Sequence, residues 1–245
     1  LKAGEAVAIA GPNGNGKTTL GKILCGIYKA SSGKIYFDGL AQNPKELQSK
    51  SIFIMQEAEF QFFTNSVWNE LKYGKKINSS LEVEMEKMLR LSGLWELRNR
   101  HPFTLSGGQM QKLVLLLAFF SNKKIIVLDE PTAGLDPIGT VQMMELFYAL
   151  NRKYNKTVLI VSHDMEQVYK YCDEVVVVED GIIRFHDSTK KFFDNSELCR
   201  SMNILPPALI QMKDSLRKKG FEISDEISDI PTLAKEIVRQ VKNHG

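Results

Sequence analysis

The amino-acid sequence predicts an α/β fold with a mostly parallel sheet and an antiparallel β portion, and three observations support this prediction. A glycine-rich loop follows the apolar run 6–10 and precedes a helical pattern. Continuous apolar runs at 125–128 and 157–161 flank an amphipathic helix predicted over 141–154, which together indicate a βαβ unit. The segment 174–185 is apolar on both sides of an Asp-Gly pair, which indicates a hairpin with a type I′ turn.

The glycine-rich loop between the first predicted strand and the first predicted helix matches the pattern G-x-x-x-x-G-K-[ST]. Its backbone N–H groups form a concave nest and the helix N-terminus adds positive potential, so the loop suits a polyphosphate. We expect Lys17 to reach the β- and γ-phosphates and the Thr18 hydroxyl to bind Mg²⁺. The alternative is an ordinary helix-capping turn. The residues predicted to contact phosphate are Gly11, Pro12, Asn13, Gly14, Asn15, Gly16, Lys17, Thr18 and Thr19.

The next part of the chain alternates short strands with helical segments. Short strands are predicted over 34–37, closed by Asp38-Gly39, and over 51–55. Between about 67 and 97 the pattern becomes helical and charged. The helix after the phosphate loop is predicted to present Leu20, Ile23, Leu24 and Ile27 on one side, and the charged segment to bury Leu81, Met85, Met88 and Leu89.

A second glycine pair precedes a long apolar helix predicted over 110–120. Ser106, Gly107, Gly108 and Gln109 stand at the start of this helix, which is an arrangement suited to an anion. One chain cannot fold both this loop and the phosphate loop around the same phosphate. A head-to-tail pair of subunits, with each nucleotide between the two kinds of loop, solves this problem. A helix N-cap with no further role is an equal alternative.

Two carboxylates end the apolar run at 125–128. Asp129 is placed at the carboxyl edge of the predicted sheet, where it can hold Mg²⁺. Glu130 is one residue further on and projects differently, so it can act as a general base toward a water, which contributes about 10²–10⁴ in rate. A solvated strand end is the alternative interpretation.

The composition changes after about residue 195, where two small helices are predicted. Pro206-Pro207 opens a helix over 208–219, which Gly220 can end. A second helix follows Pro231, with an apolar stripe made by Leu233, Ile237 and Val241. We expect these helices to be too small for a core of their own and to pack on the main domain or on a partner.

The overall composition is that of an ordinary globular domain. The chain has 245 residues, of which 43% are hydrophobic and 25% charged, and its net charge of +3 does not favour nucleic acid as a partner. The apolar stretch 113–120 is much too short to span a membrane. Cys25, Cys172 and Cys199 have no metal-type spacing, which suits a reducing compartment. If the protein works at a membrane, we expect another chain to supply the membrane part.

The segment Leu105-Ser-Gly-Gly-Gln109 resembles the signature loop of ATP-binding-cassette (ABC) ATPases, and it occurs here together with both phosphate motifs in the family's order. The resemblance covers about residues 1–195. It implies that Gln56 is a metal and water ligand and that His163 contacts the γ-phosphate. It also implies that Gly134, Leu135 and Asp136 lie at a dimer interface.

A narrower resemblance concerns residues 56–63, which are similar to the corresponding segment of energy-coupling-factor importers of vitamins, cobalt or nickel. The tail, with Pro206, Leu209, Leu216 and Gly220, is similar to that group's C-terminal dimerisation extension. Core packing is the alternative for the aromatic residues.

Three departures from the family pattern concern Asn15, Lys112 and the start of the chain. Asn15 replaces a usual serine, and we expect this to be harmless because the position works mainly through its backbone. Lys112 replaces a frequent arginine. The adenine-stacking aromatic of the family precedes the first residue here, so we expect a trimmed chain or one half of a two-cassette protein.

The resemblance implies a P-loop Mg·ATPase that powers uptake by a membrane importer. It implies a nucleotide-binding domain over 1–197, with a helical signature subdomain at about 64–118, and an extension for dimerisation over 198–245. The site would be Lys17, Glu130 and His163 for catalysis, Thr18, Gln56 and Asp129 for metal, and residues 106–109 of a second subunit.

The partners implied are a second ABC ATPase subunit and an integral membrane transport subunit at the cytoplasmic face of the membrane. The second subunit can be a copy of this chain, a different chain or a fused cassette. The alternatives are an ABC ATPase of another transporter class, a soluble ABC ATPase of DNA repair or translation, and a nucleotide-gated dimerisation module that does not hydrolyse ATP. A P-loop small-molecule kinase is disfavoured by the signature loop.

Overall fold

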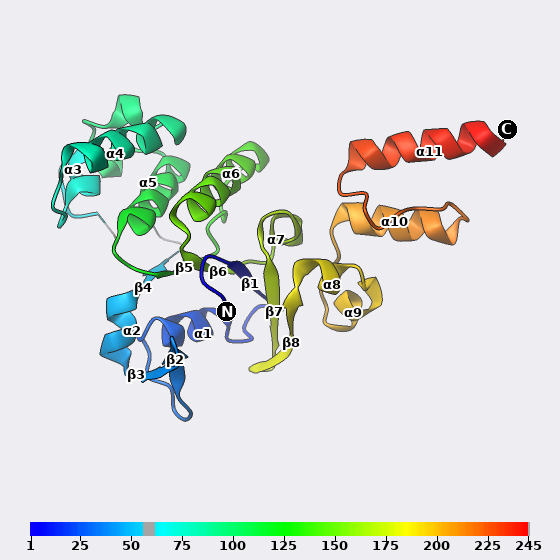
Figure 1. Ribbon diagram of the computed structural model, residues 1–245, viewed down its shortest axis with the longest axis horizontal. Helices are drawn as coiled ribbons and strands as arrows, with labels where there is room; N and C mark the ends of the chain where they lie inside the picture. The colour runs from blue at the N-terminus through cyan, green and yellow to red at the C-terminus, as the bar shows by residue number, and fades with distance from the viewer. Residues whose placement is uncertain (56–61, 245) are drawn as a thin grey trace.

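The computed structural model describes residues 1–55 and 62–244 and contains a six-stranded sheet in the order β4-β5-β6-β1-β7-β8 (Figure 1). All neighbouring strands of this sheet are parallel except β7 and β8, which form the predicted antiparallel hairpin. β2 and β3 form a separate antiparallel pair. The strands are β1 Ala6–Ala10, β2 Ile35–Phe37, β3 Leu40–Gln42, β4 Ser51–Ile54, β5 Ile125–Asp129, β6 Thr157–Val161, β7 Glu174–Glu179 and β8 Ile182–Ser188.

Helices lie on both faces of the large sheet (Figure 1). The helices are α1 Lys17–Leu24, α2 Pro44–Lys50, α3 Val67–Lys72, α4 Ser79–Leu91, α5 Gly107–Phe120, α6 Pro137–Tyr154, α7 Met165–Tyr171, α8 Thr189–Phe193, α9 Ser196–Ser201, α10 Ala208–Lys218 and α11 Ile230–His244. Short 3₁₀ turns cover Trp95–Leu97 and Pro102–Thr104.

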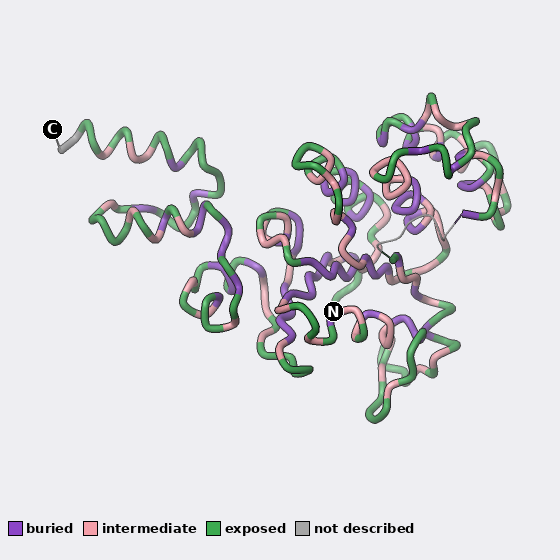
Figure 2. The backbone as a smooth tube through the Cα atoms, turned by 180° about the vertical axis from the view of Figure 1, so that it is seen from behind, coloured by how far each residue is buried: buried purple, intermediate pink, exposed green. Residues whose placement is uncertain are grey.

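The central strands are buried on both faces because alternate residues contribute to two different apolar clusters. In β1, Ala6 and Ala8 belong to a large cluster shared with α5 and α6, whereas Val7 and Ile9 belong to a smaller cluster packed against α1. This alternation explains why the strands are continuous apolar runs. Figure 2 shows the same strands as the buried centre of the molecule.

Two local predictions were incomplete for reasons of backbone conformation. α1 ends at Leu24, and Ile27 lies beyond it with half of its surface exposed, because the chain turns at Gly26 with a φ of 70°. The segment 34–37 is half of a hairpin rather than a single closed strand. Asp38 and Gly39 both have positive φ, which is the two-residue turn that sends the chain back as β3.

The charged helical region is a unit of α3, α4 and the turn at Trp95–Leu97. Met85, Met88 and Leu89 are buried in it, as predicted. Trp95 lies edge-on to Trp68 at a ring distance of 5.9 Å and has guanidinium groups near its ring. These contacts hold the short helices together, because helices of this length are marginal by themselves.

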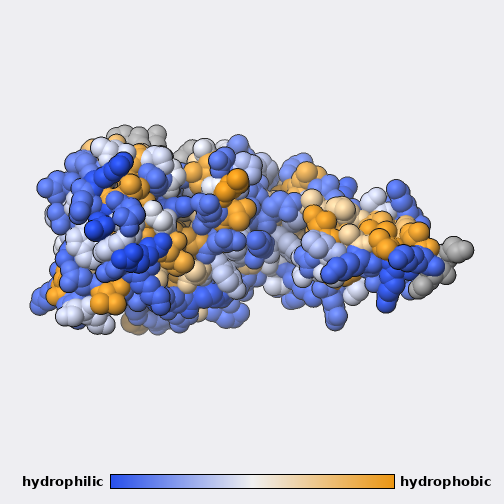
Figure 3. Space-filling model, turned by 90° about the horizontal axis from the view of Figure 1, so that it is seen from above, coloured by the Kyte–Doolittle hydropathy of each residue, from blue (hydrophilic) through white to orange (hydrophobic). Residues whose placement is uncertain are grey.

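The prediction that the C-terminal helices lack a core of their own was wrong, but the prediction that they pack on the main domain is confirmed: Ile210 of α10 belongs to the large cluster. Leu209 of α10 and Leu233 of α11 pack with Ile223 and Ile227 in a small separate cluster. Ile223 and Ile227 come from the segment that connects the two helices, which helical periodicity alone does not include. The pair of helices extends from one end of the molecule, and apolar side chains gather over it (Figures 1 and 3).

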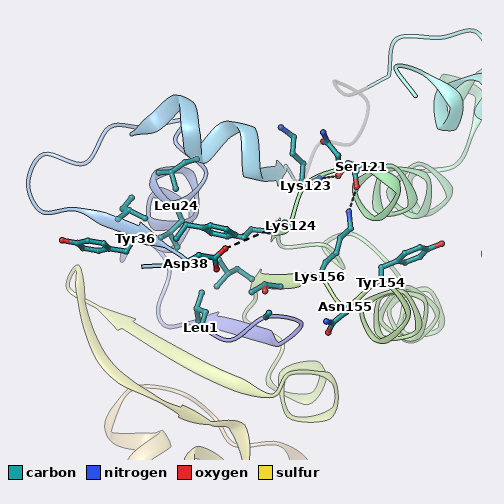
Figure 4. A pocket seen from close by; sticks show the side chains of 18 residues that line it. Leu1, Leu24, Tyr36, Asp38, Ser121, Lys123, Lys124, Tyr154, Asn155 and Lys156 are labelled. Atoms are coloured by element: carbon teal, nitrogen blue, oxygen red, sulfur yellow. Dashed lines mark hydrogen bonds and ion pairs between the residues drawn. The ribbon is translucent and has the colours of Figure 1, made fainter. Parts of the chain in front are cut away.

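A cavity of about 630 Å³ lies at the amino ends of β5 and β6, near Ile125 and Thr157 (Figure 4). The lysines around it already have partners: Lys156 donates to the carbonyl of Ser121, and Lys124 pairs with Asp38 at 4.0 Å. The cavity lies at the amino ends of the strands, whereas the predicted phosphate loop follows the carboxyl end of β1, so the two are at opposite edges of the sheet. Within the described part of the chain, no helix combines the length and the apolar character needed to cross a bilayer.

Candidate nucleotide site

Three candidate segments leave neighbouring parallel strands at the same edge of the sheet. The phosphate loop follows β1, Glu130 follows β5, and His163 comes two residues after β6. β5, β6 and β1 are adjacent in the sheet, so their carboxyl ends lie together. Ligands bind at this edge in open α/β sheets. Gly11 and His163 line one cavity of about 420 Å³ there.

The shape of the phosphate loop depends on its glycines. Gly14 and Gly16 have φ angles of 81° and 88°, in the left-handed region that favours glycine. Gly11 approaches the hairpin so closely that an added Cβ would lie 2.1 Å from the carbonyl oxygen of Val178. The loop can therefore keep this position against β7 only with glycine at residue 11.

Lys17 begins α1, and its ammonium group is turned into the loop. Its Nζ donates to the carbonyl oxygens of Gly11 at 2.8 Å and Pro12 at 2.9 Å, and the residue is buried. Burial lowers the pKa of Lys17, and the nearby carboxylates of Glu130 and Asp129 oppose this shift. The positive charge is thus placed at the loop with neutral carbonyls as its only hydrogen-bond acceptors among the described residues.

Thr18 and Asp129 meet from the two sides of the site. The Thr18 hydroxyl donates to Asp129 Oδ1 at 3.1 Å. Burial raises the pKa of Asp129, whereas the bond from Thr18 and the charges of Lys22 and Lys17 oppose the shift. Hard oxygen donors of this kind suit Mg²⁺.

No group of three or more His, Cys, Asp or Glu side chains that could hold a metal occurs among residues 1–55 and 62–244. The oxygens of Thr18 and Asp129 fit an ion that takes one or two protein ligands and completes its shell with phosphate and water, as Mg²⁺ does.

Glu130 and His163 form a direct pair. His163 Nδ1 lies 2.9 Å from Glu130 Oε2. Glu130 has a φ of 50°, and its N–H donates to the carbonyl of Val161 at 3.0 Å. A left-handed backbone at a residue other than glycine is strained, and such strain is concentrated at functional sites. This conformation turns Glu130 away from the line of β5, as the sequence predicted from its position after Asp129.

Ser106 caps α5 within its own chain. Its hydroxyl accepts a hydrogen bond from the N–H of Gln109, and the Gln109 side chain accepts one from the N–H of Ser106. A Cβ added at Gly107 would meet no atom of this chain within 4 Å. Ser106 is therefore an N-cap, as both interpretations require, and contact of residues 106–109 with a nucleotide of a second subunit stays a prediction.

The segment 134–136 lies against the start of α5 in the same chain. A Cβ added at Gly108 would meet Leu135 Cδ2 at 3.1 Å. Asp136 caps α6 by accepting from the N–H of Gly139 at 2.6 Å. Gln111, which the sequence analysis missed, donates to the carbonyl of Ala133 at 3.2 Å. The only indication of Gln111 in the sequence was its position in the predicted helix, two residues after the loop 106–109.

Gln56 and the rest of 56–61 lie outside the described residues. Of the two following aromatics, Phe62 is buried, whereas Phe63 is exposed and stacks on Tyr73 at a ring distance of 6.0 Å. Core packing thus explains one of them. Glu70 was missed: it is buried and accepts from the N–H groups of Phe63 and Thr64.

Two departures from the family pattern have structural consequences. Asn15, which the sequence predicted to act mainly through its backbone, also makes two hydrogen bonds with its side chain. Asn15 Nδ2 donates to the carbonyl of Pro12 at 3.1 Å, and Asn15 Oδ1 accepts from the N–H of Asp180 at 2.8 Å. Lys112 donates to Gln142 at 2.9 Å and so joins α5 to α6.

The chain was compared with protein-family models, curated sequences and solved structures. The model of the ABC transporter family matches residues 1–133. The energy-coupling factor transporter ATP-binding protein EcfA2 of Acetivibrio thermocellus is 32% identical over 99% of this chain and 89% of its own length. The protein of the same name from Clostridium tetani is 31% identical over 99% of this chain and 88% of its own length.

Solved structures agree with the sequence matches. The structure of cbiO1 from Clostridium perfringens, described as part of the ABC transporter complex cbiONQ, has a TM-score of 0.72 and 30% identity, covering 87% of this chain and 89% of that one. The ATP-binding cassette MJ0796, in a dimeric post-hydrolysis state with ADP and Pi, has a TM-score of 0.64 and 26% identity, covering 77% and 87%. With its mostly parallel sheet, the family match over residues 1–133 and relatives at 31–32% identity over 99% of its length, the chain belongs to the ABC transporter family, among the ATP-binding proteins of that family.

Proposed function

We propose that this protein is a Mg²⁺-dependent ATPase that powers substrate uptake by a membrane ABC importer of the energy-coupling-factor type. The observation that carries the proposal is the meeting of the phosphate loop, the Thr18–Asp129 pair and the Glu130–His163 pair at one edge of the sheet. The names of the similar proteins support the transport role.

Residues 11–19 would bind the phosphates of ATP. The loop N–H groups and the N-terminus of α1 offer donors to the phosphate oxygens, and Lys17 would move from the carbonyls of Gly11 and Pro12 to the β- and γ-phosphates. Thr18 and Asp129 would hold Mg²⁺ together with Gln56. The metal ion, when bound, neutralises charge on the phosphate oxygens.

Glu130 would accept the proton of the attacking water. Its carboxyl group is mostly shielded from solvent and lies beside His163, which is largely exposed and can turn toward the γ-phosphate. In the proposed reaction His163 orients the terminal phosphate and Glu130 activates the water. The Nδ1–Oε2 contact between them keeps both side chains at the same point of the site.

A second subunit is needed to complete this site. We propose that Ser106, Gly107, Gly108 and Gln109 of one cassette contact the nucleotide held by the other, with Gly134, Leu135 and Asp136 at the interface. The partner cassette is a copy of this chain, a different subunit or a fused cassette. The dimeric structure described for the similar cassette MJ0796 supports this arrangement.

The C-terminal extension and a membrane subunit complete the proposed assembly. We propose a nucleotide-binding domain over 1–197, with its helical subdomain at about 64–118, and a dimerisation extension over 198–245. α11 carries the exposed apolar residues Ile230, Val238 and Val241 on the extension, a surface suited to a partner. The assembly would act at the cytoplasmic face of the membrane, with an integral transport subunit and without nucleic acid.

Replacement of Glu130 by glutamine tests the proposed function. Glu130→Gln removes the base and keeps the size of the side chain, so we expect ATP to bind while the rate of phosphate release falls about 10²–10⁴-fold. The variant should also accumulate as an ATP-bound dimer in size-exclusion chromatography. Glu145→Gln, on the exposed face of α6, is the matched control and should hydrolyse ATP like the wild type. Rapid phosphate release by Glu130→Gln would remove Glu130 from the proposed role.

A further inference from the structure

The side chain of Asn15 joins two segments that are distant in the sequence. Its Nδ2 donates to the carbonyl of Pro12 inside the phosphate loop, and its Oδ1 accepts from the N–H of Asp180 at the tip of the β7–β8 hairpin. The carbonyl can only accept and the N–H can only donate, so this network determines the orientation of the amide. The hairpin tip is itself rigidly shaped, because Asp180 and Gly181 both have positive φ, as a type I′ turn requires.

The residues around Asn15 need an external support. Gly14 and Gly16 flank it with left-handed backbones, and glycines lose more conformational freedom on ordering than any other residue. A loop that must be ordered at the moment of binding weakens affinity, whereas a loop ordered beforehand does not. The bond to the hairpin fixes the middle of the loop to the sheet, and the close approach of Gly11 to Val178 fixes its beginning.

The bond to Pro12 has a second consequence. The Pro12 carbonyl accepts from both Lys17 Nζ and Asn15 Nδ2. When Lys17 turns toward a phosphate, the Pro12 carbonyl keeps the hydrogen bond from Asn15. The same amide thus reduces the free-energy cost of releasing Lys17.

We propose that Asn15 is a positioning residue that holds the phosphate loop in its binding shape by linking Pro12 to the hairpin tip at Asp180. The inference rests on the proposed function in ATP binding. Serine has one hydroxyl in place of the amide N–H₂ and carbonyl groups, on a side chain that is one atom shorter. The hairpin is therefore part of the support of the nucleotide site in this chain.

Binding of ADP to the full chain, measured by isothermal titration calorimetry, tests this role. We expect Asn15→Ser and Asn15→Ala to raise the Kd for ADP about three- to thirtyfold, because each substitution removes the two neutral hydrogen bonds of the amide. KM for ATP should rise in parallel while kcat at saturating ATP stays within about twofold. A merely structural role would instead lower the melting temperature and the active fraction without changing KM.

Variants of the hairpin provide the controls. Asp180→Asn keeps the backbone N–H and the turn, so it should bind ADP like the wild type. Gly181→Ala strains the turn, and its effect should not add to that of Asn15→Ala in a double-mutant cycle. Equal Kd values for the wild type and Asn15→Ala, or full additivity in the cycle, would overturn the inference. If the wild type itself fails to bind ADP, the proposed function fails instead.

Discussion

Lys17 and Asp129 carry opposite charges at the carboxyl edge of the sheet, and both side chains are partly shielded from solvent. Burial lowers the pKa of Lys17 and raises the pKa of Asp129, so in each case it disfavours the charged form. Phosphate oxygens near Lys17 and a divalent cation near Asp129 would each favour the charged form again. At the scale of single residues, the site is therefore arranged so that ligand binding relieves an electrostatic cost.

Lys17→Ala should weaken nucleotide binding strongly. The substitution removes a charge-assisted hydrogen bond to phosphate worth about 1.5–3 kcal/mol, which corresponds to about a 10- to 100-fold rise in the Kd for ADP. Calorimetric titration measures the change. Lys29→Ala removes an exposed lysine beyond α1 and should leave the Kd unchanged. An unaltered Kd for Lys17→Ala would contradict the assignment of the phosphate loop.

At the scale of elements, α7 connects the candidate site with the C-terminal extension. The helix starts just after His163, and Asp164 caps it. Glu166 in its first turn accepts a hydrogen bond from the N–H of Ala208, the first residue of α10, at 2.6 Å. Tyr169 packs against the small apolar cluster of the extension. Two contacts from one short helix therefore attach the extension next to the candidate site at the carboxyl edge of the sheet.

Glu166→Ala should loosen the start of α10 without unfolding the cassette. The lost acceptor is equivalent to the loss of a helix cap, about 0.5–2 kcal/mol. We expect faster hydrogen exchange of the amides at 208–211, measured by mass spectrometry, and unchanged exchange in the central strands. Glu166→Gln keeps an acceptor oxygen and should restore most of the protection. Protection of 208–211 that is equal in Glu166→Ala and the wild type would show that Glu166 does not hold the extension.

At the scale of the whole molecule, polar contacts connect the helical region with the main sheet. Glu84 of α4 accepts a hydrogen bond from Tyr154 and pairs with Lys153, both on α6. Lys156, two residues after Tyr154, donates to the carbonyls of Ala118 and Ser121 at the end of α5. Burial, with a smaller contribution from Lys75, lowers the pKa of Lys156 to about 8.

The low pKa of Lys156 predicts a pH-dependent stability. Between about pH 8 and its ordinary value of 10.5, the unfolded chain binds a proton at this lysine that the folded chain does not bind. The free energy of unfolding should therefore rise with pH in this range. Urea unfolding should show a steeper rise for the wild type than for Lys156→Met, because the variant lacks the contribution of this lysine. Parallel pH profiles for the two proteins would contradict the shifted pKa.

The sequence by itself determined the elements whose patterns are local. The apolar runs at 125–128 and 157–161, the Asp180-Gly181 turn and the strand–loop–helix context of Lys17 each occupy the predicted place. A strand that is buried on both faces needs apolar residues throughout, and a left-handed turn needs particular residues. Both requirements concern consecutive residues, so they can be recognised in the sequence without knowledge of the tertiary structure.

Only the tertiary structure decided how distant residues meet. Three contacts join segments that no local pattern relates. They are the hydrogen bond of Asn15 with the hairpin, the hydrogen bond of Glu166 with α10, and the packing of Ile223 with Leu233. A side-chain hydrogen bond depends on atoms a few ångströms apart in space, and neither its geometry nor its partner has a period along the chain. For this reason the placement of the candidate residues at this edge was predictable from the sequence, whereas the contacts that support them were not.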